Sequence, residues 1–135
     1  MTVAGEHGPR LASMPALAQA ALSPAERRLL DRFVAAAKDR LGDELLSVWL
    51  FGSRARGEAT GRLSDLDVLV VTRKGREDRD RLWDLASQLA EEEGLHPYLP
   101  QVVVWDPDWL ANRREIRSFF VQEVDRDKIV LYGSP

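Results

Sequence analysis

Cysteine is missing from this 135-residue chain, and histidine occurs only twice. Without cysteine there is no disulfide framework and no zinc site built from thiolates, a composition that suits a reducing cytoplasm. An excess of positive charge is missing too, because 22 acidic residues outnumber 19 basic ones and the net charge is −3. A dedicated nucleic-acid binder usually carries a basic face, so we expect no DNA partner.

Long hydrophobic runs are also missing. None approaches the roughly 20 apolar residues that span a bilayer, so we expect no membrane segment and a cytoplasmic location. The Ala-rich stretch 11–22 is a poor signal peptide, because Pro15 interrupts it and Arg10 is the only Lys or Arg before it. We predict that residues 1–22 form a loosely ordered leader and that residues 23–135 form one domain.

Caps and apolar spacing predict several helices. Ser23, Pro24 and Glu26 form a capping box with a first-turn proline, and apolar residues at helical spacing then continue to a stop at Gly42. A second stripe runs through residues 82–90, and Asp106-Pro107 has the pattern of a cap that opens a short third helix. A last helical stripe is predicted for Ile116, Phe119, Phe120 and Val124.

Apolar runs between these helices predict strands. Residues 45–51 and 66–72 are almost wholly apolar, which is typical of strands buried on both faces. A third strand is predicted at 101–105, and 129–132 is predicted to close the domain as a short strand or an extended tail. Strands that alternate with helices indicate an α/β domain.

The junction between the first two predicted strands carries the most informative residues. The first strand ends in Gly52-Ser53, and Arg54 and Arg56 follow. Glycine leaves no side chain between the backbone and an incoming phosphate, and Ser53 offers a hydroxyl and an N–H group. Two guanidinium groups suit a polyphosphate or a leaving pyrophosphate.

Two carboxylates open the second strand. Asp65 and Asp67 are two residues apart, so on a strand they project from the same face with Cα atoms about 6.5 Å apart. That spacing allows both to bind one Mg²⁺ or to bridge two. Asp65 alone is a common turn residue, but an unpaired Asp67 inside an apolar strand would be costly. The combined pattern therefore indicates a functional site.

The order Gly52-Ser53, spacer, Asp65-x-Asp67 is similar to that of the nucleotidyltransferase superfamily related to DNA polymerase β, and most to its minimal nucleotidyltransferases. The resemblance implies a palm-like α/β fold, with a mixed sheet and helices packed mainly on one face. It implies one or two Mg²⁺ ions held by Asp65 and Asp67, and an NTP substrate, for which we expect ATP. The residues that it assigns to the nucleotide are Gly52, Ser53, Arg54, Arg56 and Ser64. It also implies the role of antitoxin to a HEPN-domain partner, which some members adenylylate on tyrosine.

Two departures from that pattern stand out. Eleven residues separate Ser53 from Asp65, one more than usual. The third carboxylate of the family lies on the following central strand, where it binds metal and can activate the attacking hydroxyl. Gln101 occupies the corresponding place here and cannot act as a base. Asp106 is the nearest carboxylate, but Pro107 after it favours helix capping.

These observations leave two main hypotheses. The first is a Mg²⁺-dependent nucleotidyltransferase that moves an NMP, AMP in our expectation, from an NTP to a hydroxyl of a partner protein. The second is an antitoxin or regulatory binding module that kept the fold but is catalytically impaired because it lacks the third carboxylate. Transfer to a small molecule is weaker, because 135 residues leave little room for an acceptor-binding domain. We expect a partner or a homodimer to complete the site.

A few other residues have both structural and functional interpretations. Arg113, Arg114 and Arg117 form a basic group, favoured as a solvated helix face over a contact with acidic protein or RNA. Exposed Trp83 or Trp109 would suit a protein partner. Basic residues after the second strand have a modest claim to nucleotide phosphate: Arg73, Lys74 and Arg76.

Overall fold

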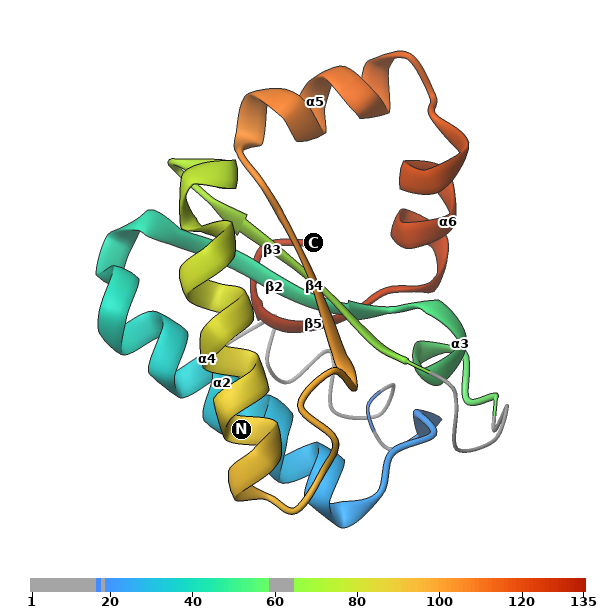
Figure 1. Cartoon of the computed structure of the whole chain (residues 1–135). Coiled ribbons are helices and arrows are strands. Elements are labelled where there is room, and N and C mark those ends of the chain that lie inside the picture. The colour runs from blue at the N-terminus through green and yellow to red at the C-terminus, as the bar shows by residue number, and fades with distance from the viewer. Residues whose placement is uncertain (1–16, 18, 59–64) are drawn as a thin grey trace, which may run out of the picture.

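The computed structural model describes residues 17, 19–58 and 65–135. The predicted leader, 1–22, lies mostly outside the described residues, as does Ser64. The described strands form one sheet in the order β4-β3-β2-β5 (Figure 1). Their bounds are β2 Leu45–Phe51, β3 Leu66–Thr72, β4 Pro100–Trp105 and β5 Ile129–Gly133. β2 pairs antiparallel with β3 and β5, whereas β3 pairs parallel with β4, so the sheet is mixed as expected.

Two long helices, α2 (Pro24–Leu41) and α4 (Arg79–Glu92), lie side by side over one face of this sheet (Figure 1). The shorter α5 (Pro107–Glu115) and α6 (Phe119–Asp127) lie on its other side. The single turn α3 (Gly52–Ala55) follows β2 directly. Two 3₁₀ turns, η1 (Gly42–Glu44) and η2 (Gly75–Asp78), complete the described elements. In this part of the chain no helix is long and apolar enough to cross a membrane.

The predicted caps are present. At the start of α2, Ser23 Oγ accepts from the backbone N–H of Glu26 at 3.1 Å, and Glu26 Oε1 accepts from the N–H of Ser23 at 2.8 Å. Asp106 Oδ1 accepts from the N–H of Trp109 at 2.8 Å at the start of α5. These local bonds satisfy N–H groups that a helix leaves unpaired at its first turn, which confirms both predicted starts.

Alternation along the strands divides the core into two layers. Val48, Val68 and Val102 represent the side chains that pack under α2 and α4. The strand residues between them point to the opposite face of the sheet, where they pack under α5 and α6 with Val121 and Val124. Because side chains alternate along a strand, Asp67 shares its face with Leu69, on the side of α5 and α6.

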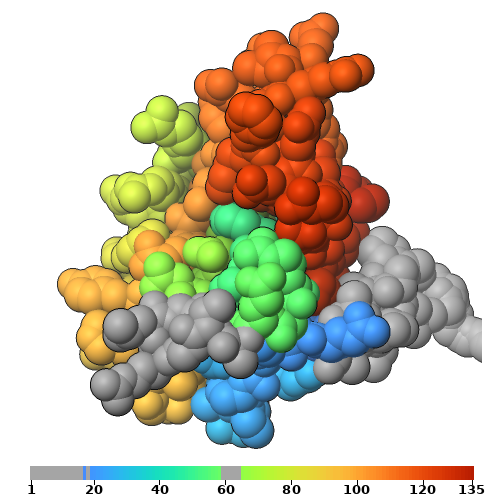
Figure 2. All heavy atoms as spheres, turned by 90° about the vertical axis from the view of Figure 1, so that its right-hand side faces the viewer, coloured from blue at the N-terminus to red at the C-terminus, as the bar shows by residue number. Residues whose placement is uncertain are grey.

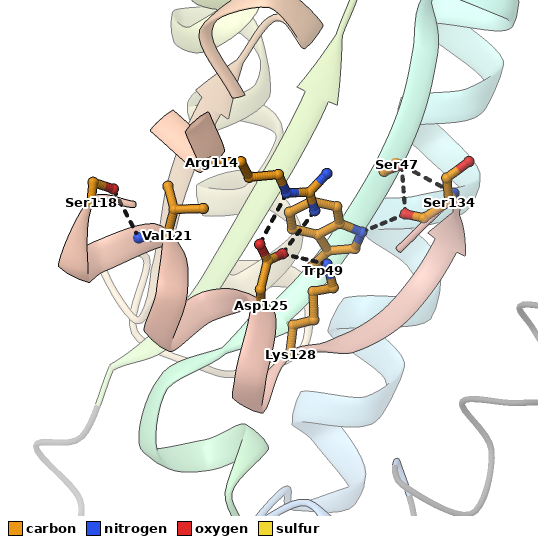
Figure 3. Close-up of polar contacts among 8 residues, drawn as sticks. All are labelled: Ser47, Trp49, Arg114, Ser118, Val121, Asp125, Lys128 and Ser134. Atoms are coloured by element: carbon orange, nitrogen blue, oxygen red, sulfur yellow. Dashed lines mark hydrogen bonds and ion pairs between the residues drawn. The ribbon is translucent and has the colours of Figure 1, made fainter. Parts of the chain in front are cut away.

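The second layer is organised around Trp49 (Figure 3). Its indole Nε1 donates to the carbonyl oxygen of Ser134 at 2.7 Å, and the Lys128 ammonium lies 3.9 Å from its ring centroid. Asp125 accepts from the guanidinium of Arg114 at 2.8 and 2.9 Å and from Lys128 at 2.7 Å. This network fastens α5, α6 and the C-terminal strand to the sheet.

The predicted stripe of Ile116, Phe119, Phe120 and Val124 is wrong for Ile116 and Phe119, whereas the partly exposed Phe120 packs edge-on against Phe51 and Trp105. Val121 and Val124 are buried, whereas Phe119 is 85% exposed. Ile116 and Phe120 are also exposed. Ile116 is separated from the others by a break between two helices: α5 ends at Glu115, Arg117 has a φ of 54°, and Ser118 caps the new helix α6. Within α6, Phe119 lies five residues before Val124 and therefore on a different face of the helix.

Candidate functional site

The turn after β2 brings Gly52 against Asp67. Phe51, the last residue of β2, is the register partner of Asp67 on β3. Gly52 has a φ of +79°, and a Cβ built on it would lie 2.5 Å from Asp67 Oδ2. Glycine is therefore required twice, by its backbone conformation and by the approach of a carboxylate. The sequence predicted that the missing side chain of Gly52 leaves space for a phosphate. The structure shows that it also leaves space for the Asp67 carboxylate.

The two aspartates differ in environment. Asp65 is exposed just before β3, whereas Asp67 is half-buried as the second residue of the strand. Burial raises the pKa of Asp67, the negative charge of Asp65 raises it further, and Arg54 and Arg56 oppose the shift. The fold thus brings Asp65, Arg54 and Arg56 within electrostatic range of Asp67.

A divalent cation fits this donor set in its chemistry. Hard carboxylate oxygens are the ligands that Mg²⁺ prefers, and a bound cation would offset both the burial of Asp67 and its repulsion by Asp65. Asp65 and Asp67 are the residues that could hold it. Within residues 19–58 and 65–135 no group of three His, Cys, Asp or Glu side chains is placed to hold a metal. A Mg²⁺ ion here would complete its shell with water and substrate oxygens.

Arg54 is buried, and part of its guanidinium is used by the scaffold. Its Nη1 donates to Glu26 Oε1 at 2.7 Å and to the carbonyl oxygen of Ala21 at 3.0 Å. Burial tends to raise the pKa of Glu26, but hydrogen bonds from Arg54 and Ser23 outweigh it, and the pKa is lowered. Arg54 therefore ties α3 to the capping box of α2. No local sequence signal predicts this pair, because 28 positions separate the two residues.

Arg56 lies at the surface and bridges two elements. Its guanidinium forms ion pairs with Glu58 at 3.0 Å and with Asp127, at the end of α6, at 3.3 Å. Figure 2 shows α3 in green directly below α6, which agrees with this bridge. Hydrogen bonds from Arg126 and Arg56 lower the pKa of Asp127. Ser53 is partly exposed in α3, between Gly52 and the buried Arg54.

Gln101 lies directly beside Asp67. The two residues are register partners on the parallel strands β3 and β4, so their side chains leave the same face of the sheet. The amide Nε2 of Gln101 donates to the carbonyl oxygen of Tyr98 at 2.9 Å. Asp106 acts as the cap of α5, as its sequence context predicts. The place beside Asp67 on β4 therefore carries an amide.

The basic residues after β3 are not brought together with the aspartates. Arg73 follows the last residue of the strand, and Asp67 is near its first. Six residues of extended chain span about 20 Å. This distance argues against the predicted contact of the basic residues after β3 with the nucleotide phosphate. The basic group on α5 and after it is not simply solvated either, because Arg113 stacks on Trp109 at 4.5 Å and Arg114 pairs with Asp125.

Known proteins are similar to this chain in sequence and in fold. "Putative protein adenylyltransferase MJ1305" of Methanocaldococcus jannaschii is 44% identical over 72 residues, which are 50% of this chain and 48% of that protein. This chain thus spans about half the length of that curated relative.

Two solved toxin–antitoxin structures share the fold. A variant of the toxin–antitoxin MntA-HpeT has a TM-score of 0.51 at 21% identity, covering 76% of this chain and 73% of that chain. A toxin–antitoxin structure with AMP-PNP has a TM-score of 0.50 at 24% identity, with the same coverage. The family model of the nucleotidyltransferase domain matches residues 30–118. The chain belongs to the nucleotidyltransferase domain family.

Proposed function

We propose that this chain transfers a nucleoside monophosphate, AMP from ATP, to a hydroxyl of a partner protein. The observation that carries the proposal is the contact between Gly52 and Asp67, which joins the Gly-Ser turn to the aspartate pair in one site. The similarity to a protein named as an adenylyltransferase and the fold shared with a toxin–antitoxin bound to AMP-PNP support the choice of nucleotide.

Asp65 and Asp67 hold Mg²⁺ in this proposal, and Gly52, Ser53, Ser64 and Arg56 contact the nucleotide phosphates. Bound Mg²⁺ neutralises charge on the phosphate oxygens and helps to orient them. Arg54 adds positive charge near Asp67, and its pair with Glu26 keeps α3 in place. Positioning and charge neutralisation of this kind supply most of the catalysis in phosphoryl-type transfer.

In the reaction, the acceptor oxygen forms a bond to the α-phosphorus while the bond from that phosphorus to the pyrophosphate oxygen breaks. The acceptor hydroxyl loses its proton in the process. The amide of Gln101 cannot take that proton, although it lies beside Asp67 where a base would be useful. The proton therefore leaves to a group that the acceptor protein or the solvent supplies.

The amide at Gln101 favours a second candidate function. A chain that binds Mg²⁺ and nucleotide but lacks the third carboxylate would serve as a catalytically impaired antitoxin or regulatory module. In both cases we propose a HEPN-domain toxin as the partner in the cytoplasm, with a homodimer as the other way to complete the site. The fold shared with toxin–antitoxin structures supports this choice.

The test is incubation of the chain with α-labelled ATP, Mg²⁺ and a HEPN-domain partner protein. We expect label on the partner with the natural chain and none with Asp67→Asn. Absence of label with correctly folded protein would exclude the enzyme. In that case, Asp67→Asn that still neutralises the toxin would support the regulatory module, and lost neutralisation with the complex intact would contradict it.

A further inference from the structure

Tyr98 lies in the turn that leads into β4, beside the aspartate pair. The parallel strands β3 and β4 begin at the same end of the sheet, where α3 also lies (Figure 1). The backbone N–H of Leu66 donates to the carbonyl oxygen of Leu99 at 3.0 Å. Tyr98 is therefore one residue away from this hydrogen bond on its side, and Asp65 and Asp67 are each one residue away on the other.

Hydrogen bonds on both sides hold the backbone of Tyr98. Its N–H donates to His96 Nδ1 at 3.1 Å, and its carbonyl oxygen accepts from Gln101 Nε2 at 2.9 Å. The N–H of Leu99 donates to the carbonyl oxygen of His96 at 3.0 Å, which closes the turn. Tyr98 is nevertheless 66% exposed, with its ring centroid 5.6 Å from that of His96. An ordered turn thus presents a phenol to solvent at the edge of the candidate site.

The order of the strands determines the side from which an acceptor approaches. In transfer from a nucleotide, the attacking oxygen and the leaving oxygen lie roughly in line on opposite sides of the phosphorus. In the proposed function the leaving pyrophosphate lies at Gly52 and Ser53, directly after β2, and Asp67 on β3 lies beside the α-phosphate. The order β4-β3-β2 then directs the acceptor to the side of β4, where Tyr98 lies.

We propose that Tyr98 is itself an acceptor, and that the chain transfers AMP from ATP to the phenol oxygen of its own Tyr98. The inference rests on the proposed function and adds a modification site to it. The Oη atom forms a bond to the α-phosphorus while the bond from that phosphorus to the pyrophosphate oxygen breaks, and the phenol proton passes to solvent. The products are an O-adenylyl-tyrosine and pyrophosphate, so the step needs no further co-reactant.

Tyr132 provides a matched control, because the chain contains two tyrosines. It belongs to β5, at the opposite edge of the sheet from β4. Its side chain packs with the layer under α2 and α4, which is the face opposite to that of Asp67. The Lys38 ammonium lies 5.2 Å from its ring centroid. We therefore expect no adenylyl group on Tyr132.

The first experiment incubates the chain alone with Mg²⁺ and α-labelled ATP, and maps the label by mass spectrometry of its peptides. We expect an adenylyl group on Tyr98 in the natural chain and in Tyr132→Phe, and loss of the label in Tyr98→Phe. ATP labelled on the γ-phosphate should leave no label, because the pyrophosphate carries that phosphorus away. Urea unfolding of both variants confirms that each is folded.

A mixing experiment tests transfer within one chain. Asp67→Asn keeps the acceptor tyrosine, and Tyr98→Phe keeps both aspartates. Transfer within the chain predicts no label on either variant when the two are mixed, and a rate per natural chain that does not change on dilution. Label on Asp67→Asn in the mixture would overturn transfer to the chain's own Tyr98.

Nitration by tetranitromethane measures the same proximity without turnover. The probe is α,β-methylene-ATP with Mg²⁺, because its methylene bridge replaces the oxygen at which the pyrophosphate leaves. At a concentration that saturates the chain, nitration of Tyr98 should slow by about tenfold, since little of the chain is then free. Nitration of Tyr132 should not change.

Several results would overturn the assignment of Tyr98: label on the partner protein but none on the chain, label on another residue, label retained in Tyr98→Phe, or nitration unaffected by bound nucleotide. Label on Tyr98 with none on the partner would reject the partner as acceptor and leave this inference standing. No label on either protein would reject both.

Discussion

A Cβ on Gly52 would lie 2.5 Å from the Oδ2 atom of Asp67, so the Gly-Ser turn and the aspartate pair form one packed unit. This close approach is a steric constraint on position 52 whether or not Asp67 takes part in catalysis. It keeps the carboxylate next to the turn that we propose for phosphate binding, and it makes any side chain at position 52 a direct perturbation of Asp67.

Gly52→Ala is therefore expected to abolish nucleotide binding in the presence of Mg²⁺ and to destabilise the fold. Gly94→Ala is the matched control, since Gly94 has a φ of +78° and nothing within 4 Å of its added Cβ. Gly94→Ala should lower the unfolding free energy by only about 1 kcal/mol, the cost of placing alanine in a left-handed backbone conformation. Urea unfolding of both variants measures the difference, and equal losses would show that the contact with Asp67 is unimportant.

Asp67→Asn is expected to increase stability near neutral pH when no divalent metal is present. Burial and the charge of Asp65 raise the pKa of Asp67, so the folded protein binds this proton more tightly than the unfolded chain. The natural chain therefore loses stability as pH rises through the raised pKa. The difference in unfolding free energy between the natural chain and Asp67→Asn should vanish at pH values below the ordinary pKa range of an aspartate.

Denaturation at a series of pH values measures this dependence. Asp65→Asn, at an exposed position, is the control and should give a smaller gain, because it removes one of the two causes of the shift. A pH-independent difference between Asp67→Asn and the natural chain would contradict the assignment to this carboxyl group.

Arg54→Ala is expected to cost about 3 kcal/mol of unfolding free energy, because it leaves the buried Glu26 carboxylate without its positively charged partner. Arg56→Ala removes ion pairs at the surface and should change stability little. Thermal and urea unfolding of the two variants provide the comparison. Equal stability losses would show that Arg54 is not part of the scaffold.

Gln101→Glu places a third carboxylate beside Asp67. We expect an increase of about tenfold in Mn²⁺ or Mg²⁺ affinity and faster nucleotide transfer, since cations of this kind gain a hard oxygen ligand. Gln122→Glu, at an exposed position on α6, adds the same charge away from the site. Calorimetric metal titration distinguishes them, and equal affinities would count against a metal-binding role for position 101.

Lys128→Ala is expected to cost about 1–2 kcal/mol, because its ammonium lies over the Trp49 ring and pairs with Asp125. Lys74→Ala, at an exposed position, serves as the control. Urea unfolding followed by tryptophan fluorescence measures the change. A stability equal to that of the control would show that the Trp49 network contributes nothing.

Predictions from local pattern were accurate where the signal lay within one element. The bounds of β2 and β3 agree with the predicted 45–51 and 66–72, and the cap at Ser23 is present. The pattern failed at Ile116, which a break separates from α6, and at Phe119, which lies on a different face of α6 from Val124. The roles of Asp65 and Asp67 remain predictions, although the structure places Asp67 within electrostatic range of Asp65, Arg54 and Arg56.

The sequence by itself determined the elements, the Gly-Ser and Asp-x-Asp motif and its family resemblance, because caps, alternation and spacing act over a few neighbouring residues. Only the tertiary structure decided the contact of Gly52 with Asp67, the pairing of Arg54 with Glu26, and the position of Gln101 beside Asp67. Those relationships join residues that are distant in the chain, and they exist only once strand order and helix packing have brought them together.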